Sequence, residues 1–215
     1  MPKINHGRKS GRKTMARGIP PENVSLTIEA GLTTAFSQLL QNGFWLKGDV
    51  ECSVKSFLCE QFGISPEYLE KRIQTIFLDG QPVDDVNTAT VRDGSTLSLS
   101  AAMPGLAGAV MRKGGFYARM RDQISYKKEG MSCSARPGRV FVKLFNLPLQ
   151  ELGPLFLEQG IWIDGNIFKN VVTDRLDDFR TGCKEVLLNG RRLEPDQLLK
   201  MDWGNGDIFL QVKII

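Results

Sequence analysis

The 215-residue chain contains Gly43-Phe-Trp-Leu-Lys-Gly48 and, in its second half, Gly160-Ile-Trp-Ile-Asp-Gly165. Each segment has a tryptophan two places after its first glycine, and the whole sequence has only three tryptophans. Two matching positions for so rare a residue indicate that the chain contains an internal repeat. If so, the elements on both sides of each segment should match as well.

The sequence before each tryptophan segment supports the repeat. Both copies begin with alternating apolar and polar residues, a pattern typical of a half-buried strand. A short stretch with helix-like apolar spacing follows, and it ends at a glycine suited to the left-handed turn that closes many helices. The corresponding residues are 24–28, 32–40 and Gly43 in the first copy, and 140–144, 149–157 and Gly160 in the second.

The sequence after each tryptophan segment matches too. Each copy has an amphipathic helix with the i, i+3, i+4 spacing of a buried stripe, formed by Val54, Phe57, Leu58 and Phe62 in one and by Phe168, Val171, Val172 and Leu176 in the other. Asp79-Gly80 and Asn189-Gly190 then separate apolar runs, which predicts a tight hairpin in both copies. A turn with glycine and a last alternating strand complete each copy, within 91–99 and 203–212.

This order of elements predicts an α+β fold made of two tandem β-grasp-like (ubiquitin-like) modules, each a mixed sheet packed on one main helix. The predicted domains are a basic flexible tail over 1–22, a first β-grasp-like module over 23–108, a basic linker over 109–139 and a second β-grasp-like module over 140–215. Modules of this size are only marginally stable alone, which favours packing against each other.

Part of the first copy resembles the ThiS/MoaD sulfur-carrier family. The similarity is carried by 77–85, 91–100 and 101–108, where an Asx-Gly hairpin precedes a glycine turn, a strand and a run of small residues. The resemblance implies a β-grasp fold and, for a carrier, a free Gly-Gly carboxylate that accepts sulfur after adenylation. Here the chain continues, so a carrier role would require cleavage after Gly114-Gly115. The alternative is that these two glycines belong to a flexible linker.

Charge is unevenly distributed along the chain. Residues 1–19 include six basic residues and no acidic one, and residues 109–139 include eight basic and two acidic residues. Because the net charge of the whole chain is +4, the remaining residues carry −8. The modules are therefore predicted to be acidic, with the positive charge in the tail and the linker.

Residues for catalysis or metal binding are scarce. A nucleophile usually needs a histidine base, and the single histidine, His6, lies in the tail. No phosphate-binding glycine loop is present. The four cysteines, which lack zinc-ligand spacing and are expected to be unpaired reduced thiols, are Cys52, Cys59, Cys133 and Cys183. We therefore expect no enzyme activity, no catalytic, cofactor-binding or metal site, no cofactor, no membrane segment, and a cytoplasmic location.

The basic linker mixes cations with aromatic residues, as do surfaces that bind single-stranded nucleic acid. The candidate nucleic-acid or partner contacts are Arg112, Lys113, Phe116, Tyr117, Arg119, Arg121, Tyr126, Lys127 and Lys128. Alternatively, these residues pack on the acidic modules of the protein itself.

The leading hypothesis is a non-enzymatic protein-interaction or scaffold protein built from a duplicated ubiquitin-like module. Its partner would be another protein, and exposed sheet edges would be available for strand addition. Two alternatives stay open. One is a sulfur-carrier-like protein that acts through Gly115 after processing, and the other is a nucleic-acid-binding protein that uses the basic tail and linker.

Overall fold

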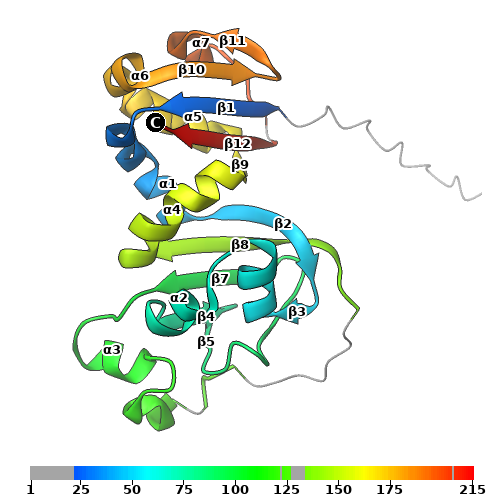
Figure 1. Ribbon diagram of the computed structural model, residues 1–215, viewed down its shortest axis with the longest axis vertical. Coiled ribbons are helices and arrows are strands. Elements are labelled where there is room, and N and C mark those ends of the chain that lie inside the picture. Colours follow the sequence, from blue (N-terminus) through cyan, green and yellow to red (C-terminus); the bar gives the residue numbers. More distant parts are fainter. Residues whose placement is uncertain (1–21, 122, 127–133, 205) are drawn as a thin grey trace, which may run out of the picture.

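The computed structural model describes residues 22–121, 123–126, 134–204 and 206–215. They form an α+β protein around one mixed ten-stranded sheet (Figure 1). In chain order the elements are β1 (Asn23–Ile28), η1 (Ala30–Phe36), α1 (Ser37–Asn42), β2 (Phe44–Val50), β3 (Cys52–Ser53), η2 (Ser56–Gln61), α2 (Pro66–Lys71), β4 (Thr75–Leu78), β5 (Gln81–Pro82), β6 (Thr90–Val91), β7 (Thr96–Ser100), α3 (Gly105–Met111), η3 (Phe116–Arg121), β8 (Arg136–Phe145), α4 (Leu147–Gln159), β9 (Ile161–Asp164), α5 (Gly165–Asp174), α6 (Leu176–Gly182), β10 (Cys183–Leu188), β11 (Arg191–Leu193), α7 (Pro195–Leu199) and β12 (Asp207–Ile214).

The large sheet has the strand order β11-β10-β1-β12-β9-β2-β8-β7-β4-β5, so β9 and β2 meet in its middle. A single antiparallel bridge at this seam joins Trp45 to Trp162. Outward from the seam, both halves have the same pairing. β2 and β9 are antiparallel to β8 and β12, which are parallel to β7 and β1. These two strands are antiparallel to β4 and β10, and each of those forms a hairpin, with β5 or β11. The first half of the sheet is β2-β8-β7-β4-β5, and the second half is β9-β12-β1-β10-β11.

The second half of the sheet contains a strand from the other end of the chain. β1 pairs in parallel with β12 and antiparallel with β10 (Figure 1), whereas β8 lies between β2 and β7. The expected equivalence of residues 24–28 with 140–144 is therefore wrong. By position, β8 corresponds to β12, and β1 corresponds to β7. The alternation of apolar and polar residues did not reveal which strands correspond, because both strands of a parallel pair with one buried face show the same period-two pattern.

Both predicted hairpins are confirmed. Asp79 and Gly80 have φ angles of 51° and 79°, and Asn189 and Gly190 have the same two values. Positive φ at both central residues defines the type I′ turn, whose twist matches that of the flanking strands. These turns join β4 to β5 and β10 to β11, so each half of the sheet ends in a hairpin of the same design.

One continuous hydrophobic core lies under both halves of the sheet. At the seam, Phe44 on β2 packs on Phe156 of α4, with ring centroids 5.5 Å apart. The expected helical stripes are largely buried, although Phe62, Val171 and Leu176 are only partly buried and the second stripe is divided between α5 and α6. Phe57 and Leu58 lie on the π-helix η2, and Phe168 is fully buried on α5.

The expected linker contains regular structure. Its described residues include the end of α3, all of η3 and the first four residues of β8, whose backbone pairs with β2. Of the expected tail, only residue 22 is among the described residues. Residues 127–133 of the expected linker also lie outside them. The prediction of a linker over 109–139 thus missed the helices α3 and η3 and the start of β8, which forms through pairing with the distant strand β2.

Three described cysteines, Cys52, Cys59 and Cys183, are partly buried free thiols, and burial raises the pKa of each. Cys133 lies outside the described residues. In the described part of the chain, no group of three or more His, Cys, Asp or Glu side chains could hold a metal ion. No helix there has the length and apolar character needed to cross a bilayer.

We expect Leu26→Ala in β1 to destabilise the second half of the sheet in particular. Leu26 is 0% exposed, and truncating a buried leucine costs about 2–5 kcal/mol. Because β1 is bonded to β10 and β12, amide hydrogen exchange through local opening should accelerate in those strands more than in β4 and β7. Thr27→Ala, on the other face of β1, is the matched control. Equal acceleration in both halves would contradict the role of β1.

Candidate interaction surfaces

The structure presents two surfaces with the chemistry of a binding site. The first is the connector, defined as residues 105–121 and 123–126, which contains α3 and η3. It lies at the β4–β5 end of the sheet, far from α6 and α7 (Figure 1). The second is the face of the sheet around the seam.

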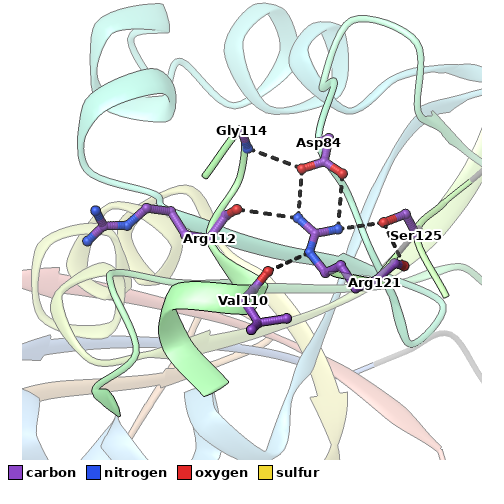
Figure 2. A network of polar contacts seen from close by, with 6 residues as sticks. All are labelled: Asp84, Val110, Arg112, Gly114, Arg121 and Ser125. Atoms are coloured by element: carbon purple, nitrogen blue, oxygen red, sulfur yellow. Dashed lines mark hydrogen bonds and ion pairs between the residues drawn. The ribbon is translucent and has the colours of Figure 1, made fainter. Parts of the chain in front are cut away.

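A buried arginine holds the connector to the sheet (Figure 2). The Arg121 guanidinium donates to both oxygens of Asp84, over 3.0 and 2.7 Å. It also donates to the Val110 and Arg112 carbonyls, over 2.7 and 3.3 Å, and to Ser125 Oγ over 2.7 Å. The side chain of Arg121 is only 1% exposed. A buried charge is tolerated when its hydrogen-bonding groups are paired in this way.

Two further residues among the predicted contacts also fasten the connector. The Lys113 ammonium donates to the Leu69 carbonyl over 2.9 Å, and burial lowers the pKa of Lys113. The backbone N–H of Tyr126 donates to the Pro82 carbonyl over 2.9 Å. Arg121, Lys113 and Tyr126 therefore stabilise the protein's own fold. The expectation that the cations of a structural linker stay solvated is wrong for Arg121, which is buried. Arg121 is too buried to contact a ligand.

The two glycines considered as a carrier tail lie inside this folded segment. The Gly114 N–H donates to Asp84 Oδ1 over 3.1 Å, and the Gly115 N–H donates to the Arg112 carbonyl over 3.1 Å. η3 begins at the next residue, Phe116. A carrier-like tail would therefore require both cleavage and release from Asp84.

The outward side of the connector is apolar. Phe116 is 89% exposed, Met120 72%, Leu106 70% and Tyr117 44%, and we call these four residues the connector patch. The rings of Phe116 and Tyr117 meet edge to face, with centroids 5.2 Å apart. A hollow of about 690 Å³ lies among Asp84 and residues 114–120. The remaining predicted contacts, Lys127 and Lys128, lie outside the described residues.

We expect Arg121→Met to release the connector without unfolding the sheet. The substitution removes the ion pair with Asp84, which is 40% exposed and can be rehydrated. The amides of Lys113 and Tyr126, which donate to Gln74 and Pro82, should then exchange faster by at least about tenfold. Amides of β8 should keep their protection. Unchanged exchange at Lys113 and Tyr126 would mean that Arg121 does not hold the connector.

The second surface is a row of four aromatic side chains across four neighbouring strands. The strand register places Phe141 opposite Trp45, Trp45 opposite Trp162, and Trp162 opposite Phe209. The ring centroids are 4.9 Å apart in the Trp45–Phe141 pair and 5.3 Å apart in the Trp162–Phe209 pair. We call these four residues the aromatic row.

Basic side chains lie over the aromatic row. The Lys47 ammonium is 3.1 Å from the centroid of the Trp162 ring, and the Arg139 guanidinium is 4.3 Å from that of Trp45. Arg139 also pairs with Asp207 over 3.2 Å. Cations are attracted to the negative face of an indole ring. Burial beside the ring lowers the pKa of Lys47, while Asp207 acts in the opposite direction.

Two glycines make room for the aromatic row. A Cβ at Gly43 would lie 2.4 Å from the Phe141 ring, and one at Gly160 would lie 2.1 Å from the Phe209 ring. The two glycines have φ of 115° and 98° with extended ψ of 158° and 137°. The expected left-handed turn is therefore wrong in its ψ angle. Glycine is required because this backbone region excludes side chains.

The aromatic row lies on the face of the sheet opposite the central helix. Neighbouring residues of a strand point to opposite faces, and Phe44, next to Trp45, packs on α4. All four rings of the row are partly exposed. Sequence reasoning paired Trp45 with Trp162 but did not place them in contact. Their match, together with the alternation around Phe141 and Phe209, was the only signal of this surface.

No protein-family model matches the chain. No curated protein and no solved structure shows significant similarity to it either.

Proposed function

We propose that this chain is a non-enzymatic protein-interaction or scaffold protein that binds another protein through the connector patch. The observation that carries the proposal is the exposure of four large apolar side chains on a segment fixed by the ion pair of a buried arginine, Arg121, with Asp84. Exposed apolar patches on a soluble protein are a common mark of an interaction site. Aromatic and methionine side chains are the types enriched at such sites.

Fixing the connector lowers the cost of binding. A partner that docks on an already ordered segment does not have to order it first, so more of the contact free energy appears as affinity. The buried Arg121 supplies this order because its five donors are held by fixed acceptors from several places in the chain.

The chemistry of the patch describes its partner. The hollow beside Phe116 and Met120 suits an apolar anchor side chain. Arg112 and Arg119 are exposed next to it, so acidic groups around that anchor would be attracted. The partner is therefore a protein segment with an apolar centre and an acidic rim.

We also infer that each half of the sheet is β-grasp-like. The mixed five-stranded pairing of each half and the helices against its buried face support this interpretation. The inclusion of β1 in the second half is a departure from two independent tandem modules. Resemblance to the sulfur carriers rests on the sequence motifs alone.

The proposal is tested by site-specific cross-linking followed by direct titration. Tyr117 is replaced by a photo-crosslinking phenylalanine analogue, the captured protein is identified, and its purified form is titrated against the full chain. Phe116→Ser combined with Met120→Ser should weaken its affinity by at least about tenfold, because such anchors carry most of the binding free energy.

Ile167→Ser is the matched control, since Ile167 is also an exposed apolar residue, 39% exposed, but lies on α5. It should leave the affinity unchanged. Thermal unfolding of each variant shows whether the fold is intact. Equal affinity of the patch variant and the control would reject the connector patch as the binding site.

A further inference from the structure

The aromatic row is independent of the connector and has a different chemistry. It combines four partly exposed rings with three cations, Lys47, Arg139 and Lys143, on the same side of the sheet. We propose that this face binds single-stranded nucleic acid, with bases stacked on the aromatic row and phosphates on the cations. This goes beyond the protein partner proposed for the connector.

The spacing of the rings fits stacked bases. The four strands are neighbours, and neighbouring strands lie about 4.8 Å apart, so the row spans about 14 Å. Aromatic residues on a sheet of this kind accommodate about two or three bases. Stacking tolerates any base, because every base presents a π face.

Two of the cations lie over the tryptophan faces, so a base that stacks there displaces Lys47 or Arg139 from the ring towards the neighbouring phosphate. Among the described residues, Lys47 and Lys143 form no ion pair, and Lys143 lies 5.7 Å from the Phe141 ring centroid. Arg139 alone is engaged, by Asp207. A phosphate next to a stacked base can therefore recruit two ammonium groups without breaking an existing ion pair.

Both basic stretches of the sequence join the sheet at this row. The strand after the tail begins at Asn23, which is in register with Phe209, and the Phe209 N–H donates to the Glu22 carbonyl over 2.9 Å. The basic stretch 109–139 leads into β8, which carries Phe141 at the other end of the row. The rest of the chain, which includes Lys47 and Lys143, carries −8, so a polyanion is attracted only where cations gather locally.

Single strands are favoured over duplexes by the row itself. A ring can stack only on a base whose face is not already covered by its neighbours in a helix. A polar hollow of about 510 Å³ on β1 and β12 is lined by Ser25, Gln211 and Lys213 and also by two carboxylates, Glu158 and Glu185, which leave no place for a phosphate. Its hydrogen-bonding groups suit the edge of an unpaired base.

The test is fluorescence anisotropy of the full chain with labelled oligouridylate and oligothymidylate of about 12 nucleotides, a length within the usual site size. Binding should be salt-dependent, and Trp45→Leu with Trp162→Leu should weaken it by about tenfold or more. Trp45→Phe with Trp162→Phe keeps the π faces and should bind within about threefold of the natural chain. The ratio of the two oligonucleotide affinities distinguishes RNA from DNA as the ligand.

The controls separate this site from others. Lys47→Gln with Lys143→Gln should reduce the slope of log affinity against log salt by about 1.4, because each phosphate that a cation no longer neutralises accounts for about 0.7. Phe116→Ser on the connector should have no effect, so this proposal and the proposed function can fail separately. Thermal unfolding verifies each fold.

Three results would overturn the proposal. One is the absence of binding at low salt. Another is equal binding by the leucine variant, with loss only when residues 1–21 are deleted, which would mean non-specific attraction to the tail. The third is equal affinity for duplex of the same length, which would assign the face to other ligands.

Discussion

The insertion of β1 between β10 and β12 is the constraint on which the rest of the structure depends. Without it, the facing edges of both strands would lose their backbone partners in the interior of the sheet, where unpaired N–H and C=O groups are costly. β1 must therefore lie beside strands from the second half of the chain. Residues 30–42 then lead from β1 to β2 in the first half of the sheet, and Phe36 within them packs on Phe179 of α6 with ring centroids 6.0 Å apart. Repetition in the sequence has produced one interdependent sheet.

The seam follows from the same repetition. Two equivalent strands, β2 and β9, each have one edge that their own half does not cover, and each covers the edge of the other. In an antiparallel contact between equivalent strands, only one pair of equivalent residues can lie opposite each other, and here that pair is Trp45 and Trp162. Their partners Phe141 and Phe209 extend the contact on both sides. Two aromatic positions, each present in both halves of the sheet, thus form a row of four rings.

Local patterns were predictable and long-range choices were not. The turns at Asp79 and Asn189 depend on two residues each, so their sequence determines their conformation. The place of β1 depends on a choice between two parallel neighbours with the same alternating pattern, and tertiary packing makes that choice. The burial of Arg121 is equally invisible in sequence, because a cation in a basic stretch gives no sign that Asp84 lies beside it.

Basic side chains have different surroundings at the two surfaces. In the connector, Arg121 and Lys113 are engaged by the fold, since their donors bind the protein's own carboxylate and carbonyl groups. Around the seam, Lys47 lies on the face of Trp162, an attraction of about 0.5–1 kcal/mol at an exposed site, and forms no ion pair among the described residues. A cation bound so weakly can move to a phosphate at little cost, whereas Arg121 cannot leave without exposing its acceptors. Basic side chains therefore have a structural role at one end of the sheet, whereas at its centre Arg139 is paired with Asp207 and Lys47 is not.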